Sequence, residues 1–566
     1  MLSLRASSRI HGLTLPHRLH LLRSMSSSVQ LPIKPLSVDE EADDFNERVQ
    51  ELNAWFNSSR FKGIKRPYTA SSVVSKQGSY KPLPLPSTPL AEKLFRMLQE
   101  AEKDGKPLHT IGVIDPIQMT QMAERQEVVY ISGWACSSTL VHGSNDVGPD
   151  LADYPYTTVP NQVHRIFRAQ QLHDRKHYDE RFSMPLEKRK NLKYIDYLRP
   201  ILADGDTGHG GLSAVMKITK LFAESCGHQG GKVVVPTNTH ISRLVASRFQ
   251  LDILQSPCFI VARTDADSAR LISSNIDPAD HEFILGTTIA GRGLAELLAE
   301  AEIRGASGDE LDAIEAEWME KHQLVTFDQA VQKEIDVAGK GATAWDEYKK
   351  AVDGKSNSEA RLVAREILGK DVFWDWDIPR TKEGFYHTTG GNEAVIKRLL
   401  AFAPYADMLW YETNTPTVEA ATRIARLVRE KFPGKQFVYN LSPSFNWAKH
   451  GFNDETLKTF IWDIAKEGYA IQLISLGGLH NTAVATASLS KKFETEGMLA
   501  YVNEVQQRER DIGCDVLTHQ KWWVVSSSPF LVLRSGANYV DRIITTVQSG
   551  NSSTAAGGKD STEHTF

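Results

Sequence analysis

The chain has 566 residues, enough for a large catalytic domain with additional segments. Hydrophobic residues make up 41% and charged residues 24%, which is typical of an ordinary soluble protein. The net charge of −5 offers no basic field for nucleic acid, and no run approaches about 18 uninterrupted apolar residues. We therefore expect neither a nucleic-acid partner nor a membrane span.

Residues 1–38 differ from the rest of the chain in amino-acid composition. This stretch carries arginines, leucines and many serines, and no acidic residue precedes Asp39. A cationic, acid-free leader is typical of an organellar presequence, so we predict the mitochondrial matrix as the location. The alternative is a disordered tail without an address. The C-terminal "EHTF" is not a peroxisomal signal of the S-K-L type.

After a helical extension over residues 39–100, strand and helix patterns alternate over 101–290 and again over 371–550. Apolar runs that end in polar or acidic residues read as buried parallel strands. These runs are 109–115, 128–134, 200–206, 259–265, 408–413, 437–444 and 471–478. The alternation predicts the α/β class and a (β/α)8 TIM-type barrel, whose catalytic groups lie at the carboxyl ends of the strands.

Seven strands are convincing where a closed barrel of this type needs eight. The strand pattern is weakest between Asp206 and Phe259, where "KVVVP" is the only apolar run and is short. Residues 291–370 are rich in Ala, Glu and Lys and predict a helical insertion. Residues 551–566 read as a polar tail.

Two carboxylates, Asp204 and Asp206, stand at a predicted strand end before a run of glycines. Carboxylates so placed suit Mg²⁺, which takes a few protein oxygens and leaves positions for a chelating substrate. On spacing alone, a pair of loop or helix-capping aspartates explains them equally well. Glu412 follows another predicted strand, where a water-mediated contact to the metal is natural.

The four cysteines show no metal or disulfide spacing, which fits a reducing compartment. Cys226 lies two residues before His228 in the glycine-rich "ESCGHQGGKVVVP", so it is a candidate reactive thiol rather than an inert buried cysteine. Further along, the chain offers neutral donors that bind carboxylates, namely Asn440, Ser442 and Ser444. Arg263 can fork onto a carboxylate, or else form a structural salt bridge. Together, the possible metal site, the arginine, the neutral donors and the thiol suit a small polycarboxylate substrate.

Several motifs in one order closely resemble the isocitrate lyase superfamily from about residue 40 to the C-terminus. They are "YISGW", "GPDLADYP", "ADGDTGHGG", "SCGHQGGKVVVP", "VARTDADSARLI" and "YNLSPSFNW", together with the helical insertion. The resemblance implies a barrel of the isocitrate lyase/phosphoenolpyruvate mutase kind, a retro-aldol cleavage that depends on Mg²⁺ or Mn²⁺, and a homotetramer with swapped helices.

The resemblance also implies roles for individual residues. Cys226, with His228 tuning it, would protonate the succinate-side carbanion on a loop that closes over substrate. Asp204 would bind the metal directly. The waters of the metal would be held by Asp150, Asp206 and Glu412. Contacts to substrate would come from Ser132, Gly133, Trp134, Gly227, His228, Arg263, Asn440, Ser442, Ser444 and Ser475.

The superfamily contains enzymes that cleave isocitrate to glyoxylate and succinate, and others that cleave 2-methylisocitrate to pyruvate and succinate. Leu473 and Ser475 stand where isocitrate lyases usually carry Phe and Thr, and Leu441 stands where they usually carry Cys. Replacing Phe by Leu and Thr by Ser leaves space of the order of a methyl group, so we predict 2-methylisocitrate as the substrate. A methylene discriminates by only about 1–3 kcal/mol, so side activity on isocitrate is expected.

Two departures from the family complicate this prediction. The strand that ends in a His-x-Glu-Asp motif is missing between Glu224 and Ser225, a deficit of roughly 16 residues that corresponds to the fourth barrel strand. An apolar stretch at 523–534 has no counterpart. A splice-boundary error or a divergent paralogue without catalysis explains both, and we expect this chain to be inactive or unable to fold. A barrel enzyme acting on phosphonopyruvate or oxaloacetate and a non-catalytic tetramer subunit are two further hypotheses.

Overall fold

The computed structural model describes residues 34–140, 154–206, 208–225 and 234–514, with a few positions beyond (516, 539, 542, 543 and 545–547). The chain divides into two compact units. The first comprises the described residues up to Asn57 together with Tyr68–Leu83, and the second comprises Ser58–Pro67 and the described residues from Pro84 onward. In the described residues no helix is both long and apolar enough to cross a membrane.

The first unit contains the helices α1 (Val38–Phe56) and α2 (Ala70–Val74). A capping box starts α1, because the Ser37 hydroxyl accepts from the Glu40 amide while the Glu40 side chain accepts from the Ser37 amide. Arg48 is buried on α1 and donates to the carbonyl of Gly78, 2.9 Å away. This bond ties α1 to the turn that follows α2.

The second unit is built on parallel strands, seven of which belong to the barrel within the described residues. They are β1 (Leu108–Ile111), β2 (Val129–Ile131), β3 (Ile201–Ala203), β4 (Val261–Thr264), β9 (Met408–Tyr411), β10 (Gln436–Asn440) and β11 (Tyr469–Ile474). One sheet has the order β1-β11-β10-β9-β4, a second pairs β2 with β3, and a parallel bridge from Gly112 to Tyr130 connects the two. The order of a (β/α) barrel follows, so the predicted fold class is confirmed.

The strand order leaves β3 and β4 at its two ends. In the described part of the chain no ladder joins these strands. A closed eight-stranded barrel would place one more strand between them. The structure thus places the gap where the sequence predicts a missing strand. Residues 226–233, which precede the bridge at Val234, lie outside the described residues.

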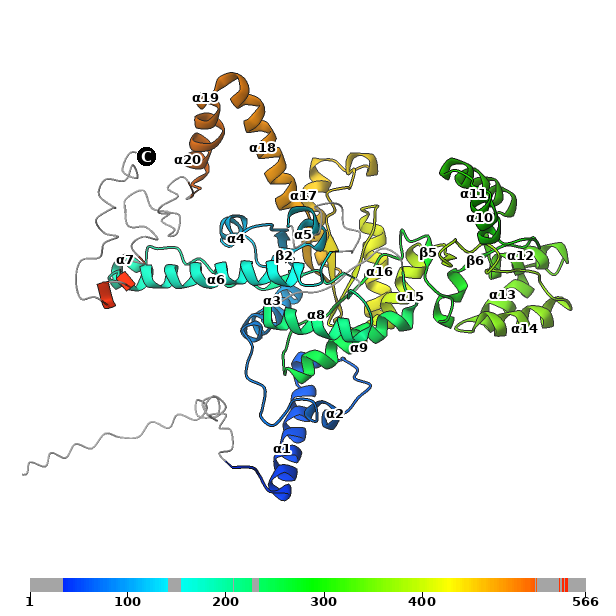
Figure 1. Cartoon of the computed structure of the whole chain (residues 1–566), viewed down its shortest axis with the longest axis horizontal. Helices are drawn as coiled ribbons and strands as arrows, with labels where there is room; N and C mark the ends of the chain where they lie inside the picture. Colours follow the sequence, from blue (N-terminus) through cyan, green and yellow to red (C-terminus); the bar gives the residue numbers. More distant parts are fainter. Residues whose placement is uncertain are drawn as a thin grey trace, which may run out of the picture. The chain divides into compact units, whose positions relative to one another are not determined.

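Helices cover the outside of the strands, and alternate strand residues point to opposite sides. The covering helices are α6 (Thr158–Ser183), α8 (Leu212–Ser225), α9 (Thr237–Ile253), α15 (Asn392–Phe402), α16 (Val418–Lys431) and α17 (Asp454–Ala465). On either side of the gap, α8 and α9 lie next to each other (Figure 1), and Thr219 donates to Ser247 between them at 3.2 Å. The helix layer therefore continues past the point where the strand layer is interrupted.

Two apolar clusters follow from this alternation. The inner cluster fills the barrel with Leu108, Val128, Tyr130, Leu202, Val261, Met408, Trp410, Val438, Ile471 and Leu473. The outer cluster packs strand residues such as Ile131, Ala262 and Tyr439 against the helices. Helix α3 (Ser87–Asp104) adds Leu94 and Leu98 to the inner cluster. The Leu98 carbonyl accepts from Gln436 at the start of β10, so α3 covers the amino ends of the strands.

The helical insertion has its own core around Tyr348 and Trp374. Its helices are α10 (Leu294–Ile303), α11 (Gly308–His322), α12 (Phe327–Val337), α13 (Gly341–Val352) and α14 (Asn357–Leu368). Capping boxes begin α11, α12 and α14, which explains why these short helices start where they do. Short strand pairs link it to the barrel: β5 (Leu271–Ile272) with β8 (Tyr386–His387), and β6 (Leu285–Gly286) with β7 (Val325–Thr326).

Smaller elements complete the second unit. They are η1 (Ser59–Phe61), α4 (Pro116–Met122), α5 (Gly133–Thr139), α7 (Leu186–Arg189), η2 (Pro278–Phe283) and η3 (Ala448–His450). After β11 the chain forms α18 (Gly477–Glu496), α19 (Met498–Tyr501), η4 (Val502–Gln507) and α20 (Arg508–Ile512). This last group exposes apolar side chains, namely Val484, Phe493, Met498, Leu499 and Ile512.

Candidate functional site

The predicted polar residues meet at the carboxyl ends of the barrel strands, a region we call the mouth. Side chains two residues apart on a strand point to the same side. Leu202 and Trp410 point into the barrel, so Asp204 and Glu412, two residues later, follow the same direction into the mouth. Arg263 on β4 and Asn440 at the end of β10 join them.

Asp204 is buried and held from two sides. Its Oδ2 atom accepts a hydrogen bond from the Tyr130 hydroxyl at 2.9 Å and another from the Gly133 amide at 3.0 Å. Burial and the neighbouring Asp204 carboxylate raise the pKa of Tyr130 well above its ordinary value. The phenol therefore keeps its proton and remains a donor to the carboxylate.

Glu412 is fixed through both of its oxygens. Oε1 accepts from Asn440 Nδ2 at 2.8 Å, and Oε2 accepts from the indole nitrogen of Trp410 at 3.0 Å. Burial raises the pKa of Glu412, although Arg263, with Nη2 3.8 Å from Oε2, opposes that rise. Two hydrogen bonds at separate oxygens define the plane of the carboxylate.

Arg263 forks onto Asp265, with Nε and Nη2 at 2.9 and 3.1 Å from its two oxygens. Its guanidinium also lies over the Trp410 ring, 4.7 Å from the centroid. Burial alone would lower the pKa of Arg263, but the carboxylates of Asp265, Glu412 and Asp204 outweigh it and hold the pKa above its ordinary value. The structural salt bridge that the sequence left open is thus present, and it carries a permanent positive charge into the mouth.

The "SGW" segment joins β2 to α5. Ser132 caps α5 by accepting from the Ala135 amide at 3.3 Å, and Trp134 is 36% exposed. A Cβ atom added at Gly133 would lie 2.5 Å from the Tyr154 hydroxyl and 2.6 Å from Asp206 Oδ1. Only glycine lets the backbone approach Asp206 this closely.

Asp206 itself has a left-handed backbone with φ of 50° and is buried. A left-handed non-glycine residue is uncommon and clusters at functional positions. The His209 ring nitrogen Nε2 lies 3.6 Å from Asp206 Oδ2. Gly133 lies against both Asp204 and Asp206, so the two aspartates belong to the same side of the mouth.

The predicted hydroxyl and specificity residues fall in different places. Ser442 and Ser444 follow β10, and the Ser444 amide donates to the Ser442 hydroxyl at 3.3 Å. Leu473 is fully buried inside the barrel and is paired in register with Asn440. Ser475, half-buried, follows directly after β11. Leu441, one residue beyond Asn440, instead packs against the outer cluster.

Four of the predicted residues, Asp150, Cys226, Gly227 and His228, lie outside the described residues. Among the residues that the structure describes, no group of three His, Cys, Asp or Glu side chains could hold a metal by itself. The donor set nevertheless suits Mg²⁺, which usually takes one or two carboxylates and completes its shell with water. The buried Oδ1 of Asn440 has no hydrogen-bond partner within the described chain, so the mouth presents a further oxygen acceptor.

Two residues that hold the mouth together were missed by the sequence reasoning: Tyr130 and Trp410. Each helps to place a carboxylate: Tyr130 donates to Asp204 at the end of the neighbouring strand, and Trp410 donates to Glu412 two positions later. The period of two along a strand puts them on the inner side, and this signal was available in the sequence. Neither residue lies at a strand end, where the catalytic groups of a barrel are expected, so neither stands out as a candidate.

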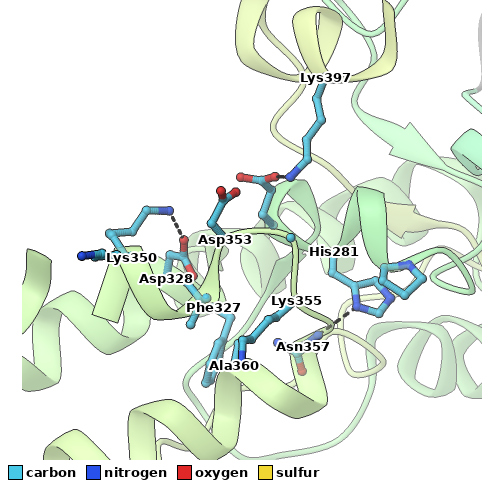
Figure 2. A pocket seen from close by; sticks show the side chains of 14 residues that line it. His281, Phe327, Asp328, Lys350, Asp353, Lys355, Asn357, Ala360 and Lys397 are labelled. Carbon is cyan, nitrogen blue, oxygen red and sulfur yellow. Dashed lines mark hydrogen bonds and ion pairs between the residues drawn. The ribbon is translucent and has the colours of Figure 1, made fainter. Parts of the chain in front are cut away.

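A separate cavity of about 430 Å³ lies where η2 and α15 face α12, α13 and α14 (Figure 2). Its charged side chains pair with one another, as Lys349 does with Asp328 at 2.6 Å and Lys397 with Glu282. His281 accepts at Nδ1 from the Asn357 amide at 3.0 Å. The cavity contains none of the mouth residues and is a junction between insertion and barrel.

Comparison with known proteins gives one family match, to the isocitrate lyase family over residues 48–566. The chain is 52% identical over 542 residues to a mitochondrial 2-methylisocitrate lyase of Hypocrea atroviridis, covering 92% of this chain and 94% of that protein. It is 45% identical over 554 residues to the mitochondrial 2-methylisocitrate lyase of Saccharomyces cerevisiae, covering 91% and 92%. An isocitrate lyase of Oryza sativa is 43% identical over 560 residues, covering 94% and 95%.

Proposed function

Because the chain belongs to the isocitrate lyase family, we propose that it is a carbon–carbon lyase that cleaves 2-methylisocitrate to pyruvate and succinate. The observation that carries the proposal is the mouth of the barrel. There Asp204, Glu412, Asn440 and Arg263 converge from β3, β9, β10 and β4. The two relatives named as 2-methylisocitrate lyases, at 52% and 45% identity, support this substrate over isocitrate.

A divalent cation, Mg²⁺ or Mn²⁺, fits the oxygen donors of the mouth. Asp204 would bind it directly, and Asp206 and Glu412 would hold its waters, together with Asp150. When bound, the cation supplies positive charge that stabilises the enolate-like fragment. The support is the chemistry of the donors: carboxylates and an amide oxygen prefer a hard cation.

The side chains of the chain bind and orient the substrate. Arg263 carries its positive charge under the mouth, while Ser442, Ser444 and Ser475 offer hydroxyls at the ends of β10 and β11. Ser132, Gly133 and Trp134 line the same opening from the end of β2. Neutral hydroxyls and one guanidinium suit a substrate with several carboxylates.

Proton transfer completes the proposed cleavage. A base takes the proton of the substrate hydroxyl, the C–C bond breaks, and its electron pair stays on the succinate-side carbon. The thiol of Cys226, with Gly227 and His228 beside it in sequence, gives its proton to that carbon. Leu473, paired in register with Asn440, and Ser475, two residues later, would leave room for the extra methyl group of 2-methylisocitrate.

Location and assembly extend the same proposal. The cationic leader and the mitochondrial relatives support import into the mitochondrial matrix. The apolar side chains exposed on α18–α20 support a homotetramer in which these helices pack on a neighbouring subunit. Mass measurement in solution and microscopy of the full chain, with and without residues 1–38, test these two statements.

The second candidate is a family member that has lost catalysis, and it is favoured because no ladder joins β3 to β4 among the described residues. The test is release of pyruvate from 2-methylisocitrate and of glyoxylate from isocitrate by the purified full chain, with and without Mg²⁺. Faster pyruvate release that needs the cation supports the proposal. Faster glyoxylate release identifies an isocitrate lyase, and failure on both substrates identifies a non-catalytic subunit.

A further inference from the structure

Trp410 lies at the centre of the barrel rather than at its mouth. It is 3% exposed on β9, and its Cα is paired with Arg263 on β4 and with Val438 on β10. A tryptophan at this position fills the barrel interior between strands. Filling space is therefore one role of the side chain.

Three further contacts connect Trp410 with the polar residues above it. Its indole N–H donates to Glu412 Oε2 at 3.0 Å, and its ring lies 4.7 Å beneath the guanidinium carbon of Arg263. The ring of Tyr130, whose hydroxyl holds Asp204, meets Trp410 edge-on at 6.2 Å between centroids. One side chain thus contacts two charged groups of the mouth, Glu412 and Arg263, and the tyrosine that holds a third, Asp204.

Of these contacts, the hydrogen bond to Glu412 is the one that fixes the orientation of its carboxylate. Asn440 holds one oxygen of Glu412 and Trp410 holds the other, so rotation of the carboxylate about its terminal bond breaks at least one bond. Without the indole donor, the Glu412 carboxylate keeps, among the described residues, the amide of Asn440 and the more distant Arg263. The direction in which its oxygens point then becomes less defined.

We propose that Trp410 is a positioning residue, which aims the Glu412 carboxylate at the divalent cation of the mouth through its indole N–H. The inference rests on the proposed function for the presence of the cation, and it goes beyond that function by adding a residue that touches neither cation nor substrate. A residue of this kind acts on affinity and turnover through its neighbour.

The test compares Trp410→Phe with Trp374→Phe in the full chain. Both tryptophans are buried, and both donate one indole hydrogen bond, which Trp374 gives to the Val325 carbonyl at 2.8 Å in the helical insertion. The affinity for Mn²⁺ in the absence of substrate is measured by titration calorimetry and by the electron paramagnetic resonance signal of the free ion. We expect Trp410→Phe to weaken Mn²⁺ binding about tenfold and to lower kcat with little change in KM, and Trp374→Phe to change neither.

A double-mutant cycle separates positioning from packing. If Trp410 acts through Glu412, then Trp410→Phe has little further effect on Mn²⁺ affinity in a Glu412→Gln background. If the effects of the two substitutions multiply, Trp410 acts independently of Glu412 and the inference is overturned. An unchanged Mn²⁺ affinity and kcat in Trp410→Phe overturn it as well.

Failure to fold is also decisive. Trp410→Tyr is the second variant, because it keeps an aromatic ring and lacks the indole donor. If neither Trp410 variant folds while Trp374→Phe does, the role is structural and the inference is wrong. A wild-type chain that binds Mn²⁺ but releases no product would overturn the proposed function alone, whereas an active wild type with an unaltered Trp410→Phe would overturn the inference alone. A wild type that binds no Mn²⁺ would overturn the inference whatever its activity.

Discussion

The two ladders of the barrel support the mouth unequally. The continuous sheet β1-β11-β10-β9-β4 carries Arg263, Glu412, Asn440 and Ser475 on strands that pair with their neighbours. The β2–β3 pair carries Asp204 and the "SGW" segment, and in the described chain it joins the rest of the barrel through the bridge between Gly112 and Tyr130. The proposed direct metal ligand therefore stands on the less supported side, and local stability should differ between the two.

Supplying a strand should have the largest effect. Inserting between Glu224 and Ser225 a strand of roughly 16 residues that ends in the His-x-Glu-Asp motif should pair β3 with β4 and fix Asp204 relative to Glu412. A misplacement of about 1 Å costs on the order of a hundredfold in rate, so we expect kcat for pyruvate release to rise by at least about that factor.

Hydrogen exchange provides the structural readout of the same insertion. Amides of β3 and β4 should gain protection, whereas those of β10 and β11 should keep theirs because they are already paired. Equal protection of all strands before the insertion, with unchanged turnover after it, would remove the distinction between the two ladders.

The continuous sheet is locked at its amino ends by Asp407, which precedes β9. Its Oδ1 lies 2.6 Å from Arg60, and its Oδ2 pairs with Arg248 and accepts from the Ile260 amide at 2.6 Å. Although burial alone would raise it, the two guanidinium groups hold the pKa of Asp407 well below its usual range. The ion-paired form therefore stabilises the fold above the ordinary aspartate pKa near 3.8 and loses this contribution in stronger acid.

Asp407→Asn removes the carboxylate that pairs with two buried arginines, so we expect a loss of about 3–5 kcal/mol in the free energy of unfolding by urea. The matched control is Asp371→Asn, because Asp371 forks with Arg365 on the exposed surface of the insertion at 2.6 and 2.8 Å. That change should cost less than about 1 kcal/mol. Equal losses in the two variants would show that the buried ion pairs of Asp407 contribute no more to stability than the exposed pair of Asp371.

On the two-stranded side, Gly133→Ala should act through steric contact. Its Cβ would meet Tyr154 and Asp206 at 2.5 and 2.6 Å, and relief of such overpacking costs about 1–3 kcal/mol. Because the shift falls on Asp206, Mn²⁺ affinity should fall together with stability. Gly211→Ala, with no atom within 4 Å of the added carbon, is the control and should leave both unchanged. Loss of stability with unchanged Mn²⁺ affinity would show that Asp206 does not contribute to metal binding.

Much of this arrangement could be predicted from the sequence. Buried apolar runs located all seven strands, with the run at 437–444 corresponding to β10 (Gln436–Asn440), and the count of runs located the gap. Residues at strand ends converge in any parallel barrel, which is why Asp204, Glu412 and Asn440 meet.

The contacts across strands could not be predicted in the same way. The indole bond of Trp410 to Glu412 and the outward packing of Leu441 depend on side-chain direction and register, which a single sequence does not specify. The sequence also left open whether Arg263 forms a structural salt bridge, because a guanidinium can fork either onto a carboxylate of the protein, here that of Asp265, or onto a carboxylate of a substrate.

The last expected effect concerns acid, and it falls on the helix that covers the gap. His240 on α9 packs edge-on against Phe402 at 4.6 Å, and burial, with Arg398 and Arg243 nearby, lowers the pKa of His240 to about 3. A histidine that is neutral in the fold gains a proton on unfolding below pH about 6.5, so stability should fall as the pH drops from 6.5 toward 3. The slope for one such group is about 1.4 kcal/mol per pH unit.

His240→Leu removes this group, so between pH 6 and pH 4 the unfolding free energy of the variant should fall less steeply by about that slope, whatever its value at pH 7. His173 and His177 on α6, each with a pKa lowered to about 4 by burial, remain and keep part of the acid sensitivity. Urea unfolding at several pH values measures the slopes. Parallel curves for the two proteins would mean that His240 titrates alike in the folded and unfolded states. A reduced slope would instead place part of the acid sensitivity at α9, next to the gap between β3 and β4.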